Sequence, residues 1–246
     1  MNIQTKPSVP LDEIEYPESD GKPMAENTLQ FLWITYLKDN FDFLFRDRPD
    51  VFVAGDLLWY PVYGNNALCA APDTMIAFGR PKGHRGSYLQ WQEGNVAPQV
   101  VWEVLSPGNR AGELRDKFEF YERHGVAEYY QYDPDRGELR GWLRDNDQLR
   151  PIAAIRGWTS PRTGVRMDLD GTDLLLVDPA GNRFKTYDEV RTEMEQERAA
   201  CLAAEKDCRQ MKSAQTQVEQ ERKEAEARAE RLAAKLRALG IDPDAE

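Results

Sequence analysis

An apolar stretch with one carboxylate inside it, residues 99–105, constrains the fold of this chain more than any other feature. Its residues from Val100 to Leu105 are apolar except Glu103, which is the only ionisable group. Such runs are typical of strands that are buried on both faces of a sheet. An unpaired carboxylate there would cost several kcal/mol or take up a proton. We therefore expect a cation beside Glu103.

The helix predicted at residues 113–124 offers that cation. Its core-facing stripe follows the i, i+3, i+4, i+7 spacing and consists of Leu114, Lys117, Phe118 and Tyr121. Lys117 thus occupies a position where a leucine would be expected, so we predict that it points inward. Gly125 then ends the helix.

A second acid, Asp73, lies at the head of the apolar run 72–78, which predicts another strand. An aspartate at the start of a strand is often only a turn residue. Two acids on neighbouring strands with a lysine beside them nevertheless suit divalent-metal chemistry on a phosphodiester. Carboxylates supply hard oxygens for the metal, and the ammonium can act on a water molecule or on developing charge.

Four phrases and a closing coiled coil, taken in this order, resemble the Uma family of putative bacterial restriction endonucleases, within the PD-(D/E)XK nuclease superfamily. The phrases are VFVAGDLLWYPV, APDTMIAFGRPKG, VVWEVLSPGNR and DKFEFYERHGVAEYYQYDP. The resemblance covers roughly residues 26–179. It implies an α/β fold with a restriction-endonuclease-like core, in which helices flank a mixed central sheet, followed here by the long C-terminal coiled-coil helix.

The resemblance also implies a DNA-cleaving hydrolase that depends on Mg²⁺ or Mn²⁺. Asp73, Glu103 and the backbone carbonyl of Val104 would hold the metal, and Lys117 would position or polarise the attacking water. One position departs from the superfamily pattern, because the lysine expected two residues after the acid is Leu105. A lysine on the next helix is a known variation of that pattern. The alternative function is a nuclease-like fold that no longer cuts and serves as a binding or scaffold module through its tail.

Two further acids, Glu26 and Asp56, are candidates for the same site. Apolar residues at helical spacing predict an amphipathic helix at 26–40, and a carboxylate near its start favours the helix dipole. The resemblance leaves open that Glu26 reaches the metal instead. Asp56 interrupts the strand expected at 51–60, and it either ends that strand in a turn or reaches the metal site.

The segment 79–95 is rich in glycine and polar residues, and predicts a long loop between the two acid-bearing strands. Arg80, Lys82 and Arg85 make it the most basic local patch, and Tyr88 and Trp91 could stack on a base or sugar. We expect either phosphate contact or a solvated loop with an aromatic anchor. The net charge of −11 counts against tight nonspecific binding of DNA.

The tail at residues 188–240 carries a heptad seam that is sustained for seven repeats, with Gln215 and Arg222 as polar interruptions. It predicts a coiled coil, formed with a second copy or another helical partner. A single solvated helix is the alternative, because alanines weaken the seam. The expected organisation is an extended leader at 1–22, the nuclease-like domain at 23–187, the coiled-coil helix at 188–240 and a short tail at 241–246.

The cysteines and the apolar runs of the sequence indicate the cellular compartment. The three cysteines form no C-x-x-C pair, which argues against a disulfide framework or a zinc site. The chain has no run of apolar residues long enough to span a membrane, and its start lacks the pattern of a signal peptide. We therefore expect a cytoplasmic protein with reduced cysteines and no membrane partner.

Overall fold

The computed structural model describes residues 14–21, 23–108 and 111–239. Contacts divide the chain into two units at Thr186 and Tyr187, and each is described separately. The elements of the first unit are α1 (Thr28–Leu44), β1 (Val51–Ala54), β2 (Trp59–Tyr60), β3 (Thr74–Phe78), β4 (Tyr88–Leu89), the 3₁₀ helix η2 (Gln90–Glu93), β5 (Val100–Val104), α2 (Ala111–Arg123), β6 (Glu128–Asp133), β7 (Glu138–Asp145), β8 (Gln148–Pro151), β9 (Trp158–Thr159), β10 (Arg166–Asp170) and β11 (Asp173–Val177).

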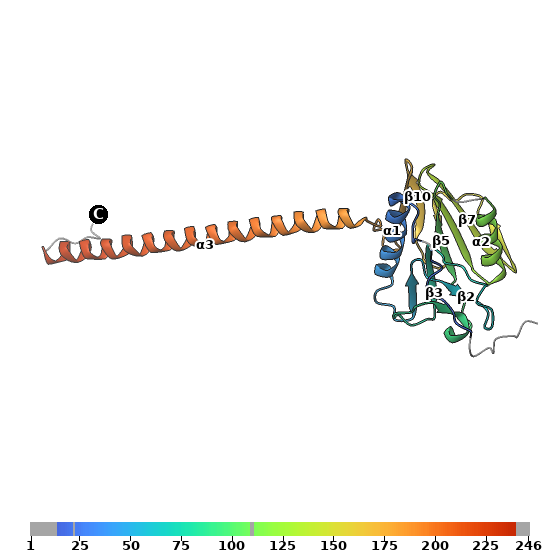
Figure 1. Ribbon diagram of the computed structural model, residues 1–246. Helices are drawn as coiled ribbons and strands as arrows, with labels where there is room; N and C mark the ends of the chain where they lie inside the picture. Colours follow the sequence, from blue (N-terminus) through green and yellow to red (C-terminus); the bar gives the residue numbers. More distant parts are fainter. Residues whose placement is uncertain (1–13, 22, 109–110, 240–246) are drawn as a thin grey trace, which may run out of the picture. The chain divides into compact units, whose positions relative to one another are not determined.

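A six-stranded sheet in the order β1-β3-β5-β6-β7-β8 forms the centre of the first unit. Strands β5 and β6 pair in parallel, and the other neighbours pair antiparallel. Helices α1 and α2 lie on opposite sides of this sheet (Figure 1). The expected fold class, a mixed sheet flanked by helices and followed by a long C-terminal helix, is confirmed.

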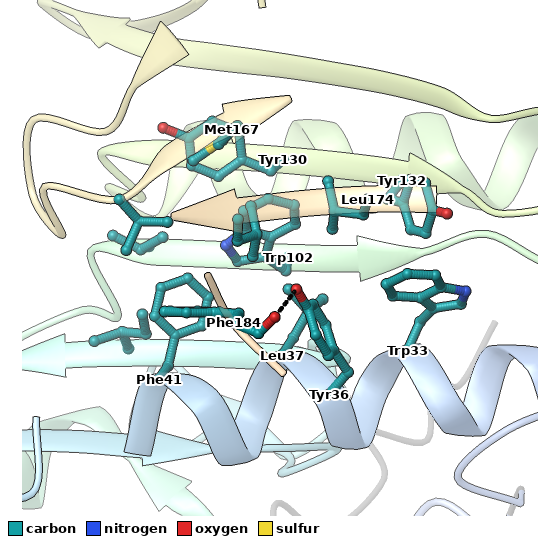
Figure 2. Close-up of a cluster of buried hydrophobic side chains, with 14 of the residues drawn as sticks. Trp33, Tyr36, Leu37, Phe41, Trp102, Tyr130, Tyr132, Met167, Leu174 and Phe184 are labelled. Atoms are coloured by element: carbon teal, nitrogen blue, oxygen red, sulfur yellow. Dashed lines mark hydrogen bonds between the residues drawn. The ribbon is translucent and has the colours of Figure 1, made fainter. Parts of the chain in front are cut away.

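One face of the sheet packs against α1 and the small sheet β11-β10-β9. The indole of Trp102 lies at the middle of this core, between Phe41 of α1 and Tyr130 of β6 (Figure 2). The Tyr36 hydroxyl donates to the Phe184 carbonyl at 3.4 Å. This large aromatic core fixes α1 against β5, which brings the start of the helix to the C-terminal end of that strand.

The other face of the sheet packs against α2. Side chains of a strand alternate between the two faces, and Val101 of β5 lies in the cluster under α2 together with Met75 of β3. Glu103 and Asp73 are each two residues away from these positions. The alternation therefore predicts both acids on the α2 face, where Lys117 is located.

The strand expected at 51–60 is interrupted at Asp56, as predicted: it is divided into β1 and β2, because Asp56 has a positive φ of 46° and turns the chain between them. The prediction for residues 79–95 was wrong, since the expected loop contains β4 and the 3₁₀ helix, and β4 pairs in parallel with β2. Strands of two residues have too little periodicity to be detected in a sequence.

The described part of the second unit contains one helix, α3 (Tyr187–Ala238), with 52 residues. At 1.5 Å per residue it is about 78 Å long. None of its residues is buried, and the apolar side chains along it are exposed, including Met194, Met211, Val218 and Leu232. Within the described ranges, no helix has the length and apolar character that crossing a bilayer requires.

Candidate active site

The carboxylate of Glu103 is held from α2 through both of its oxygens. The Lys117 ammonium lies 2.6 Å from Oε2, and the Tyr121 hydroxyl donates to Oε1 at 2.5 Å. Glu103 is 3% exposed, whereas 24% of the Lys117 side chain is exposed. The buried acid therefore has the cationic partner that its apolar surroundings require, and that partner reaches the surface.

The carboxylate of Asp73 occupies the position that a continued β3 strand would take. The ladder between β3 and β5 ends at the pair Thr74 and Trp102, so Val104 has no strand partner on that side. Its N–H instead donates to Asp73 Oδ2 at 2.6 Å. Asp73 is 7% exposed, and its side chain is thereby fixed against the end of β5.

The electrostatics of the site are those of two buried acids that share one cation. Burial raises the pKa of Asp73 well above its ordinary value, the charge of Glu103 raises it further, and Lys117 offsets only part of this. Burial alone would lower the pKa of Lys117, but the carboxylates of Glu103 and Asp73 outweigh it and the pKa is raised. Lys117 therefore stays protonated. Its positive charge offsets only part of the cost of ionising Asp73.

These residues fit a hard divalent cation. A positive ion beside Asp73 would favour the ionised form of that acid, which burial and Glu103 now disfavour, and carboxylate and carbonyl oxygens are its preferred ligands. In the part of the chain that the structure describes, no three His, Cys, Asp or Glu side chains gather closely enough to hold a metal. Asp73 and Glu103 would therefore need the Val104 carbonyl and solvent to complete such a site.

Glu26 lies just before α1 rather than inside it. The helix begins at Thr28 with Asn27 as its N-cap, so the expected start at residue 26 was two residues early. The Glu26 carboxylate accepts a hydrogen bond from the Ser106 hydroxyl at 2.5 Å. The Glu26 carboxylate also packs closely against Gly108 in the turn that follows β5. A side chain at Gly108 would clash with it, because an added Cβ would lie 2.0 Å from Glu26 Oε2.

Asp56 stands at the turn between β1 and β2, as one of its two predicted roles required. The Asp56 N–H donates to the carbonyl of Pro72 at 3.1 Å, and Pro72 directly precedes Asp73 in the sequence. Burial and the charge of Asp20 raise the pKa of Asp56 to about 6, while Lys117 lowers it. Asp56 is therefore both a turn residue and an electrostatic neighbour of the candidate site.

The basic side chains of the 79–95 segment form ion pairs within the chain, and the two arginines share one carboxylate. Arg80 and Arg85 both pair with Glu93, at 3.1 and 2.6 Å, and Lys82 pairs with Asp42 at 3.0 Å. Tyr88 is fully buried, which favours the alternative of an aromatic anchor over stacking on a base. Its side chain is buried because this segment packs against the sheet instead of forming an open loop. Phosphate contact by Arg80, Lys82 and Arg85 stays a prediction.

Two residues at the site were not singled out as functional from the sequence. The position of Tyr121 predicts only a core-facing side chain, and no motif of the sequence includes Gln30. The Gln30 side-chain amide donates to the Val104 carbonyl at 2.9 Å. The available signal was a glutamine among the apolar positions of an amphipathic helix, where a polar side chain needs a buried partner.

A mixed α/β sheet that brings two acids and a lysine to one point at the end of a central strand defines a nuclease-like core of the restriction-endonuclease type. The model of the Uma2 family, described as putative restriction endonuclease, matches residues 16–169. The chain belongs to this family.

Among solved structures, the chain is similar to the crystal structure of a putative nuclease belonging to DUF820 from Anabaena variabilis ATCC 29413. The match has 14% sequence identity and a TM-score of 0.44, and covers 62% of this chain and 88% of the other. No curated protein matches the chain.

Proposed function

We propose that this protein is a metal-dependent endonuclease that hydrolyses phosphodiester bonds in DNA. The observation that carries the proposal is that Asp73, Glu103 and Lys117, from three separate segments, are electrostatic neighbours at the end of β5, where both acids are buried and Lys117 reaches the surface. Lys117 contacts Glu103 at 2.6 Å, and the Val104 N–H, next to Glu103 in the sequence, donates to Asp73 at 2.6 Å. Membership of the Uma2 family supports the same reaction class.

The proposed roles follow from the chemistry of each group. Asp73, Glu103 and the Val104 carbonyl would hold Mg²⁺ or Mn²⁺, which when bound supplies a Lewis acid and offsets charge on the phosphate. Lys117 keeps its proton because its pKa is raised. It therefore acts as a donor that positions the attacking water or stabilises developing negative charge, and not as a general base. Glu26 and Asp56 are the additional acids that we propose at the edge of the site.

The proposal is tested by incubating the purified full chain with supercoiled and linear DNA in the presence of Mg²⁺ or Mn²⁺. We expect cleavage that EDTA stops and that added metal restores. Glu103→Gln should remove cleavage, because the substitution removes a charged ligand. Cleavage that persists in EDTA, or that is unchanged in Glu103→Gln, would contradict the proposal.

The second candidate function is a nuclease-like module that no longer cuts and binds partners through its tail. Two observations favour it: Leu105 stands in the usual lysine position, and both oxygens of Glu103 are already engaged by Lys117 and Tyr121. Calorimetric titration with Mn²⁺ distinguishes the two functions. An inactive module binds no stoichiometric Mn²⁺. The enzyme binds stoichiometric Mn²⁺, and Glu103→Gln abolishes this binding.

We also propose that α3 pairs with a second copy of the chain. The proposal rests on the heptad seam and on the exposure of its apolar residues, of which Val218 is 65% and Leu232 54% exposed. Sedimentation equilibrium of the full chain should then show a dimer. Val218→Lys should weaken the dimer about tenfold or more because it places a charge in the seam, while Gln217→Lys, its neighbour outside the seam, should not. Equal effects of the two substitutions would contradict pairing through this seam.

A further inference from the structure

The backbone of Val104 lies at a gap in the central sheet. Strand β3 begins at Thr74, and the last pair of its ladder with β5 is Thr74 and Trp102. On the other side, β6 continues alongside β5 to the pair of Val104 and Tyr132. The polar backbone groups of Val104 at the gap therefore depend on side chains: Asp73 accepts from its N–H, and its carbonyl accepts from Gln30 Nε2 at 2.9 Å.

The Gln30 side chain is fixed at both ends of its amide. Its Oε1 accepts from the Glu26 N–H at 2.8 Å while its Nε2 donates to the Val104 carbonyl. These partners determine the orientation of the amide, because a backbone N–H only donates and a carbonyl only accepts. The backbone of Gln30 is held in turn by Asn27, whose Oδ1 accepts from the Gln30 N–H at 2.8 Å.

Gln30 takes a position on α1 that would otherwise be apolar. Gln30 is 6% exposed, and the buried residues that follow it on the same face are Trp33, Ile34, Leu37 and Phe41. A buried amide costs free energy unless it is hydrogen-bonded. Here the amide supplies a hydrogen bond to the very carbonyl that would face the metal.

We infer that Gln30 is a positioning residue, which fixes the direction of the Val104 carbonyl so that this oxygen can serve as a ligand of the divalent cation. A carbonyl oxygen has two lone pairs. The Gln30 amide occupies one of them, and the other remains for the ion. This inference rests on the proposed metal-dependent function. Loss of a residue that orients a ligand typically weakens metal affinity by 10- to 100-fold.

The test is the affinity of the intact protein for Mn²⁺, measured by titration calorimetry, in the wild type and in Gln30→Met. Methionine has a similar length and no donor for the Val104 carbonyl. The matched control is Asn40→Ala on the same helix. Asn40 also joins α1 to a distant backbone segment, since its Nδ2 donates to the Lys185 carbonyl at 2.9 Å and its Oδ1 accepts from the Lys185 N–H at 3.1 Å. Denaturation in urea is followed for all three proteins.

We expect Gln30→Met to weaken Mn²⁺ binding about tenfold or more, and Asn40→Ala to bind Mn²⁺ like the wild type although it is less stable. Equal Mn²⁺ affinity of folded Gln30→Met and the wild type would overturn the role of Gln30 and leave the proposed nuclease standing. Weakening of the same size in Asn40→Ala would also overturn it, because general loosening of α1 would then explain the effect. Absence of Mn²⁺ binding in the wild type would overturn the proposed function and this inference together.

Discussion

Replacing Lys117 by methionine is expected to lower the rate of DNA cleavage by at least about a hundredfold, the scale of losing one preorganised charge at a reacting centre. The same change should destabilise the metal-free protein by about 3 kcal/mol, because it leaves the carboxylate of Glu103 buried without its cation. Cleavage of a DNA substrate and unfolding in urea measure the two effects.

Lys38→Met is the matched control for this substitution. Lys38 also pairs with a carboxylate, that of Asp42, at 3.4 Å, but 44% of the Asp42 side chain is exposed. Exposed ion pairs contribute about 1 kcal/mol or less, so this variant should keep both its cleavage rate and nearly all of its stability. Wild-type cleavage by Lys117→Met would remove Lys117 from the mechanism.

Replacing Asp73 by asparagine is expected to abolish Mn²⁺ binding and cleavage while it stabilises the metal-free fold. The asparagine Oδ1 can still accept from the Val104 N–H, so the hydrogen bond at the end of β5 is kept. The substitution removes a buried charge that burial and Glu103 disfavour. Relief of an unfavourable charge commonly adds roughly 1 kcal/mol. Calorimetric titration and urea unfolding at pH 7 check these outcomes.

The pH dependence of stability gives an independent check on Asp73. Its pKa is raised in the folded state, so the folded protein binds a proton that the unfolded chain has already released. Stability therefore falls as the pH rises from about 4, the ordinary pKa of aspartate, towards the folded pKa. Asp73→Asn should remove this part of the fall. An unchanged pH profile, or a variant less stable than the wild type at pH 7, would show that the charge of Asp73 is not the destabilising element.

The core of the site could be predicted from the sequence because burial leaves few options for a charged group. Glu103 stands in a run of apolar residues, and Lys117 replaces an apolar residue in a helical stripe. The pairing of β3 with β5 could not be obtained from periodicity, which does not specify the order of strands. The family resemblance supplied that order, and with it the expected proximity of Asp73 and Glu103.

Other parts of the site depend on contacts between distant segments that no local pattern reports. Gln30 and Val104 are 74 residues apart, and their hydrogen bond exists only because the aromatic core docks α1 on β5. The partners of Arg80 and Arg85 depend equally on where Glu93 lies after β4 has paired with β2. A basic sequence patch indicates available charge, but the folded chain decides whether that charge is already neutralised.

The contacts that build the candidate site join residues that lie far apart in the sequence. Asp73 meets Val104 across 31 residues, Glu103 meets Tyr121 across 18, and Gln30 meets Val104 across 74. A nascent chain cannot form the contact between Glu103 and Tyr121 before Tyr121 has left the ribosome, and such long-range contacts form slowly because loops must first close. The complete site therefore forms only after the chain has folded through Tyr121, and a chain that ends before this residue should lack the proposed activity.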